Sequence, residues 1–63
     1  MDNVEFNKCL EAIRHNTEEF QGTSNVAHLE ANALVWRKLT VAGRANEASD
    51  IFAEEALEEM ILG

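Results

Sequence analysis

Three side chains in this 63-residue sequence could ligate a soft metal ion or serve as a nucleophile with its base: Cys9, His15 and His28. A structural zinc site needs several such ligands at short spacings such as Cys-x-x-Cys, and no pair among the three has one. Cys9 and His15 are six residues apart, which places them on opposite sides of a helix. We therefore expect no metal site and interpret Cys9 as a small buried hydrophobe.

Carboxylates recur at helical spacing near the C-terminal end of the sequence. Glu54 with Glu58, and Glu55 with Glu59, stand four residues apart, so each pair could share a proton or bind a cation. A solvated helix face carries the same pattern. The sequence has no glycine-rich phosphate loop and no GxSxG or HExxH motif. It predicts a protein that is not an enzyme and needs no cofactor.

The elements that position these residues must come from a very small core. A chain of this length forms one domain, residues 1–63, and buries only about 60 % of its unfolded surface. Leu, Ile, Val and Phe make up about 25 % of it, enough for a charged chain to fold. There is no proline, and Ala, Glu and Leu are abundant. The expected fold class is all-α.

The glycines at positions 22 and 43 divide the chain into three expected helices, because glycine commonly ends a helix. The first covers about residues 3–21 and is capped by Asp2 or Asn3. The second runs from a cap at Thr23 or Ser24 to about residue 42. The third follows a cap at Asn46 and runs to about residue 62. The short joint between the last two predicts an antiparallel hairpin, with one kinked helix as the alternative.

The second expected helix is apolar around most of its circumference. Two other short helices cannot cover both of its faces, so a second copy of the chain is the natural cover. Trp36 lies on this helix and is expected in the core or at the dimer seam, with an exposed anchor for another protein as the alternative. The predicted homodimer interface consists of Leu29, Ala33, Val35, Trp36 and Leu39.

Charge is unevenly distributed along a chain whose net charge is −7. Residues 47–63 contain six acidic residues and no basic one. We expect this helix to dock on a basic surface of another protein. The predicted partner-binding residues are Glu54, Glu55, Glu58 and Glu59. A mimic of nucleic acid that inhibits a basic host protein is the alternative function. Direct DNA binding would depend on Arg37, Lys38 and Arg44 and is disfavoured by the overall charge.

Two resemblances add context. The segment Gly43-Arg-Ala-Asn-Glu-Ala-Ser-Asp-Ile-Phe52 resembles the second half of a tetratricopeptide repeat, which implies a helical hairpin. In size, acidic balance and capped helices, the whole chain resembles the small accessory proteins encoded in the early regions of lambda-like temperate phages. That resemblance implies a host-acting or developmental regulator that works by binding protein.

The start of the sequence, Met-Asp-Asn-Val-Glu, is polar and does not resemble a signal peptide. No run approaches the roughly 20 apolar residues that cross a bilayer. We therefore expect a cytoplasmic protein, in the host cytoplasm if the chain is phage-encoded, and no membrane partner.

Overall fold

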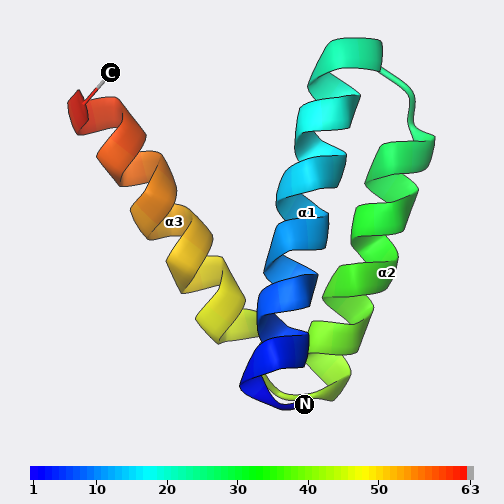
Figure 1. The fold of residues 1–63 in the computed structure, drawn as a ribbon, viewed down its shortest axis with the longest axis vertical. Coiled ribbons are helices and arrows are strands. Elements are labelled where there is room, and N and C mark those ends of the chain that lie inside the picture. The colour runs from blue at the N-terminus through cyan, green and yellow to red at the C-terminus, as the bar shows by residue number, and fades with distance from the viewer. Residues whose placement is uncertain (63) are drawn as a thin grey trace.

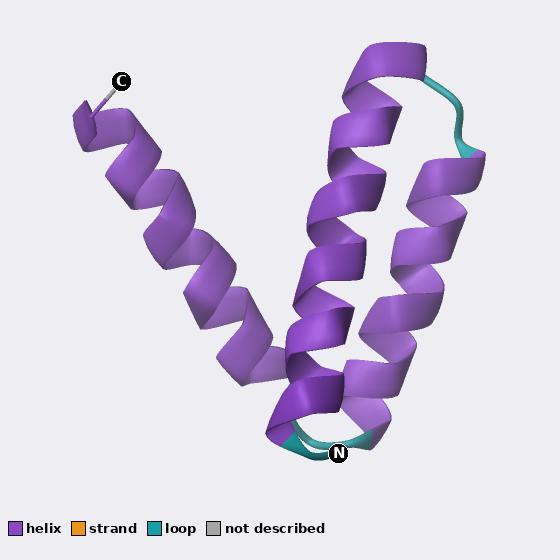
Figure 2. Cartoon of the chain, in the orientation of Figure 1, coloured by secondary structure: helices purple, strands orange, loops and turns teal. Residues whose placement is uncertain are grey.

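The computed structural model describes residues 1–62 as three helices, and the described residues contain no strand. The helices are α1 (Asn3–Thr23), α2 (Ala27–Val41) and α3 (Ala45–Leu62), joined by short turns (Figures 1 and 2). The all-α fold class predicted from the composition is confirmed. The absence of proline and the abundance of alanine, glutamate and leucine account for it.

The two N-terminal helices form the hairpin of this fold. α1 and α2 run antiparallel and pack along their length, whereas α3 meets them at its N-terminal end and then diverges (Figure 1). The antiparallel hairpin predicted for the second and third helices is therefore not confirmed. The joint between α2 and α3 is as short as expected, but the direction in which α3 leaves it keeps the two helices apart.

The ends of α1 follow the side chains available there. Asp2 accepts a hydrogen bond from the backbone N–H of Glu5 at 2.8 Å and caps the helix as predicted. At the other end, Ser24 and not Gly22 takes the left-handed conformation, with φ of 56°. Gly22 lies inside α1, and Asn25 rather than Thr23 or Ser24 supports the start of α2, accepting from the N–H of Ala27 at 3.0 Å.

The turn between α2 and α3 is a Schellman motif centred on Gly43, whose φ is +74°. The N–H of Arg44 donates to the carbonyl of Leu39 at 2.9 Å, and the N–H of Gly43 donates to the carbonyl of Thr40 at 3.0 Å. Gly43 thus ends α2 as predicted, and the kinked continuous helix is excluded. α3 begins at Ala45, before the cap expected at Asn46.

The core lies at the closed end of the molecule, where all three helices meet. α1 contributes three side chains spaced by four and three residues, and α2 and α3 contribute one each. Towards the far end of the hairpin the contact becomes polar, with the amide of Asn32 donating to the hydroxyl of Thr17 at 3.2 Å. The buried residues are Phe6, Leu10, Ile13, Leu39 and Ala48. Only the N-terminal part of α3 reaches this core, which explains why its remainder projects freely.

Among residues 1–62, no helix has the length and apolar character needed to cross a membrane.

Candidate functional site

The residues with potential for metal or nucleophilic chemistry are not gathered into a site. Cys9 is half-buried and packs against the core, His28 is half-buried on α2, and His15 is exposed on α1. Within residues 1–62, no cluster of histidine, cysteine and carboxylate side chains is able to hold a metal ion. The described surface is therefore considered by its charged and apolar faces.

The residues predicted to form a dimer interface are largely used within one chain. Leu39 has no exposed surface and is a core residue, so it is not available to a second copy as expected. Val35 and Trp36 are half-buried against the same core. Leu29, 45 % exposed, and Ala33 stay on the surface of α2.

Trp36 joins α2 to α3. Its ring meets Phe52 edge to face, with centroids 6.0 Å apart and planes at 62°. Both rings are half-buried and pack on the core. Trp36 therefore packs inside one chain, which is one of the two positions expected for it, and its contact with a second copy stays a prediction.

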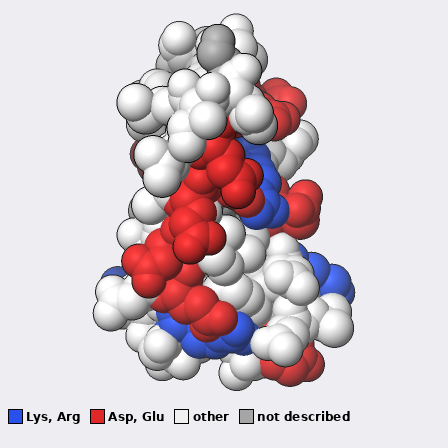
Figure 3. Space-filling model, turned by 90° about the vertical axis from the view of Figure 1, so that its left-hand side faces the viewer, with Lys and Arg blue, Asp and Glu red and all other residues white. Residues whose placement is uncertain are grey.

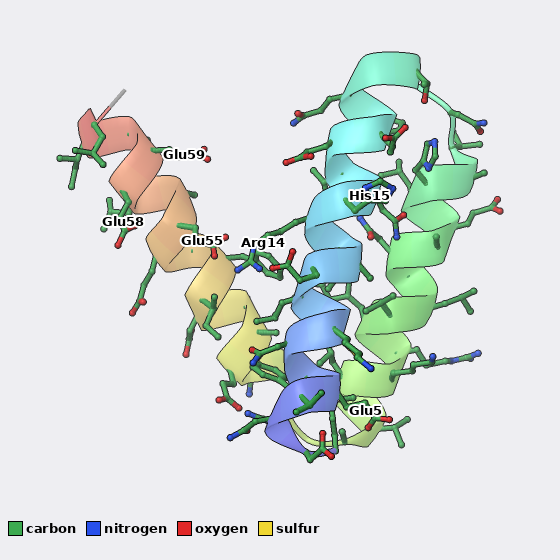
Figure 4. All side chains as sticks on the ribbon, in the orientation of Figure 1. Glu5, Arg14, His15, Glu55, Glu58 and Glu59 are labelled. Carbon is green, nitrogen blue, oxygen red and sulfur yellow. The ribbon has the colours of Figure 1, made fainter. Side chains whose placement is uncertain are left out.

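Arg14 joins α1 to α3 beside this aromatic pair. Its guanidinium binds the carboxylate of Glu55 through Nη2 and through Nε, the latter 3.3 Å from Oε2, and it contacts Glu11 at 2.7 Å (Figure 4). It also lies over the ring of Phe52, 5.5 Å from the centroid. The hydrogen bond with Glu55 is the main cause of the raised pKa of Arg14.

A second arginine, Arg44, lies directly before the N-terminal end of α3. Arg44 donates to both carboxylate oxygens of Glu47, at 2.8 and 3.0 Å, and to the side chain of Asn3 at 3.2 Å. Its guanidinium carbon lies 3.7 Å from the centroid of Phe6. The pair raises the pKa of Arg44 and lowers that of Glu47, in both cases chiefly through their hydrogen bond. Arg44 is thus engaged within the chain, which leaves Arg37 and Lys38 as the exposed members of the predicted basic cluster.

The four glutamates predicted to bind a partner do not share one face. Glu55 is bound by Arg14 within the chain, so it is the paired member of the predicted partner-binding set. Glu59 follows Glu55 by one helical turn on the side of α3 that faces the hairpin, whereas Glu58 points away from it (Figure 4). Helical spacing places Glu54 and Asp50 on the same outer line as Glu58.

Asp50, Glu54 and Glu58 form what we call the acidic stripe. All three are exposed, and none of them makes an ion pair within residues 1–62. A continuous red band follows α3 in the space-filling view, with blue arginine and lysine atoms beside it (Figure 3). The charge of residues 47–63 is enough to identify α3 as the acidic helix. Which of its carboxylates are unpaired depends on the contact between Arg14 and Glu55, which are 41 residues apart in sequence.

Next to the acidic stripe lies an apolar stripe that the sequence did not separate from the core-facing side of α3. Leu57, Met60 and Ile61 are 57 %, 81 % and 75 % exposed. Their spacing is compatible with one broad buried face shared with Phe52. In the structure only Phe52 packs against the core, and the other three are exposed. The angle between side chains around the helix could have separated the two faces, because Leu57 is turned by about 140° from Phe52 at 100° per residue.

A hollow with a volume of about 780 Å³ runs between α1 and α2. Apolar side chains form most of its lining, with three basic side chains among the polar residues. We call it the hairpin groove. It is lined by Met1, Glu5, Lys8, Cys9, Ala12, Val35, Arg37, Lys38, Val41 and Ala42.

Comparison with models of protein families gave no match, and neither did comparison with curated proteins or with solved structures.

Proposed function

We propose that this chain is a small non-catalytic protein–protein interaction module. It binds a basic surface of another protein through the acidic stripe of α3. The observation that carries the proposal is the row of three exposed, unpaired carboxylates on a helix that projects from the hairpin (Figure 1). Such a row attracts a positively charged surface and fixes its register.

The way α3 is held supports this assignment. Arg14 binds Glu55 and so attaches α3 to α1, while Arg44, directly before α3, binds Glu47 and also donates to Asn3 of α1. Arg14 is thereby used on the hairpin side of α3, and Arg44 is used at Glu47, at the N-terminal end of the line that Glu54 and Glu58 continue, so the acidic stripe itself stays unpaired. A regulatory or host-acting accessory protein, as the phage resemblance implies, would work by this kind of contact and would act in the host cytoplasm.

Self-association is the second part of the proposal. Of the predicted interface residues, Leu29 and Ala33 keep apolar surface on α2, where Leu34 and Val41 are also exposed, and the apolar stripe of α3 adds a second exposed apolar surface. A homodimer centred on the Trp36 helix would have to do without Leu39 and most of Val35 and Trp36. We therefore propose that the contact between copies includes the apolar stripe of α3.

Charge reversal tests partner binding. The variant Asp50→Lys/Glu54→Lys/Glu58→Lys is compared with Glu18→Lys/Glu19→Lys/Glu30→Lys, which changes the net charge equally at exposed positions outside α3. The proteins are used to capture partners from an extract of the natural host. The first variant should lose the partner and the second should retain it. Equal capture by both would contradict the proposal.

Competition by duplex DNA distinguishes the nucleic-acid mimic from other acidic ligands. If the captured protein is one whose DNA-binding groove α3 occupies, duplex DNA should displace the chain, and salt should weaken the complex steeply. A complex that DNA leaves intact would assign the acidic stripe to a protein surface that does not bind nucleic acid.

A further inference from the structure

The chain has more surface than a compact monomer of its mass. A folded monomer of 7.0 kDa has about 4,000 Å² of accessible surface, whereas this chain has 4757 Å². Its radius of gyration is 12.3 Å, compared with about 10.6 Å for a compact chain of the same length. The surplus of about 700 Å² is close to the ~800 Å² that each partner contributes to a standard interface.

The C-terminal half of α3 projects from the hairpin and carries several of the exposed large apolar side chains (Figure 1). Its apolar stripe, Leu57, Met60 and Ile61, has the i, i+3, i+4 spacing with which an amphipathic helix enters an apolar groove. Glu54 and Glu58 lie along one side of this stripe. The projecting half of α3 therefore resembles a groove-binding helix with an acidic margin.

The hairpin groove has the complementary properties. Its apolar lining includes Ala12, Val35 and Val41, and Val41 is 85 % exposed. Lys8, Arg37 and Lys38 supply positive charge around it and are all exposed. A helix that brings apolar side chains flanked by carboxylates finds both an apolar lining and opposite charge there.

The α3 helix of the same chain cannot fill this groove. Arg14 binds α3, and Ala12, two residues before it, projects from nearly the opposite side of α1 and lines the groove. On α2, Trp36 contacts α3 through Phe52, while Lys38 is turned away from that side and also lines the groove. The groove and the chain's own α3 are thus on different faces of the hairpin.

We propose that the apolar stripe of α3 docks in the hairpin groove of a second copy of the chain. The proposal specifies the self-association named above. Glu54 and Glu58 meet Lys8, Arg37 and Lys38 of the other copy at the margin of the contact. Because stripe and groove are different surfaces, the contact is heterologous, so copies add head to tail into a ring or an open chain.

The single cysteine provides a direct test, because Cys9 lines the groove. The purified variant Leu57→Cys is oxidised and run on a non-reducing gel beside Glu19→Cys, which carries its new thiol at an exposed site outside both surfaces. We expect Leu57→Cys to form a disulfide between Cys9 of one chain and the introduced thiol of another, at least tenfold faster than Glu19→Cys forms any dimer. Mapping of the linked peptides identifies the bond. Equal rates, or a bond that joins only the introduced thiols, would overturn the proposal.

Exchanging the charges of Lys38 and Glu58 tests the ion pairs at the margin of the contact, with self-association measured by sedimentation. Lys38→Glu and Glu58→Lys should each weaken self-association several-fold, and the two changes combined in one chain should restore it. Circular dichroism checks that each variant keeps its helix content. A wild-type chain that remains monomeric up to about 1 mM would also overturn the proposal. Only the purified chain is used, so failure here leaves partner capture by the acidic stripe untouched.

Discussion

Arg14 on α1 grips Glu55 on α3 across 41 residues of sequence, with two guanidinium nitrogens on two carboxylate oxygens. The guanidinium also lies over Phe52, one turn before Glu55. The contact therefore combines an ion pair with a cation–π contact at the point where α3 begins to diverge. It helps to hold α3 at its angle to the hairpin and removes one carboxylate from the outer surface.

Loss of the Glu55 charge should destabilise the chain slightly. The side chains of Arg14 and Glu55 are 34 % and 42 % exposed, so solvent screens their attraction. We expect Glu55→Gln to lower the free energy of unfolding by less than about 1 kcal/mol, and by less still at high salt. Urea unfolding at low and high salt measures both effects. Glu54→Gln, which removes an unpaired carboxylate next to it, is the control and should not match the low-salt loss.

The Arg44–Glu47 pair should give the chain a specific sensitivity to acid. The pKa of Glu47 is lowered in the folded state by its hydrogen bond to Arg44. Its contribution to stability is therefore fully present above the ordinary glutamate pKa of about 4.3 and is lost as the pH falls through the lowered folded-state pKa. Wild type should unfold at higher urea than Glu47→Gln at neutral pH, and the two midpoints should converge in acid. A difference that does not change with pH would show that the charge is not the cause.

The two internal glycines should respond in opposite ways to alanine. Gly22 lies within α1 with open space around it, so Gly22→Ala should raise the free energy of unfolding by about 1 kcal/mol through helix propensity. Gly43 also has open space but a φ of +74°, so Gly43→Ala should cost about 1–2 kcal/mol in backbone strain. Thermal unfolding of both variants tests the two assignments. Equal shifts in the same direction would contradict them.

Truncation of two leucines on α2 distinguishes the core from the surface of that helix. Leu39 has no exposed area, so Leu39→Ala should lose about 2–5 kcal/mol, a large part of the stability of so small a domain. Leu34 is 61 % exposed, and Leu34→Ala should change stability by no more than about 0.5 kcal/mol. Urea unfolding followed by circular dichroism measures both. A small loss for Leu39→Ala would contradict its place in the core.

Local sequence signals predicted the helices well. Asp2 caps α1, Gly43 ends α2, and the stripe of Phe6, Leu10 and Ile13 is buried. These features depend on residues within one or two helical turns. The Ser24 cap was missed because the left-handed position lies two residues beyond the glycine that seemed to mark it.

Pairing of the helices was not predictable in the same way. An apolar stripe shows that a face is buried but not which helix covers it, and α2 is apolar on more than one side. The contacts that decide the arrangement, Arg14 with Glu55 and Trp36 with Phe52, join residues far apart in sequence. The acidic segment was recognised from its composition. The acidic stripe could be distinguished from Glu55 only once the position of Arg14 was known.

Under the proposed function, the apolar stripe of α3 makes its contacts between molecules and does not stabilise a single chain. The most direct measurement is the free energy of unfolding of Leu57→Gln/Ile61→Gln, at a dilution where sedimentation shows only monomer. Glutamine keeps helix propensity, so the structure predicts a change within about 0.5 kcal/mol of wild type. A loss of about 2 kcal/mol or more would show that these side chains are buried within one chain. That result would contradict the claim.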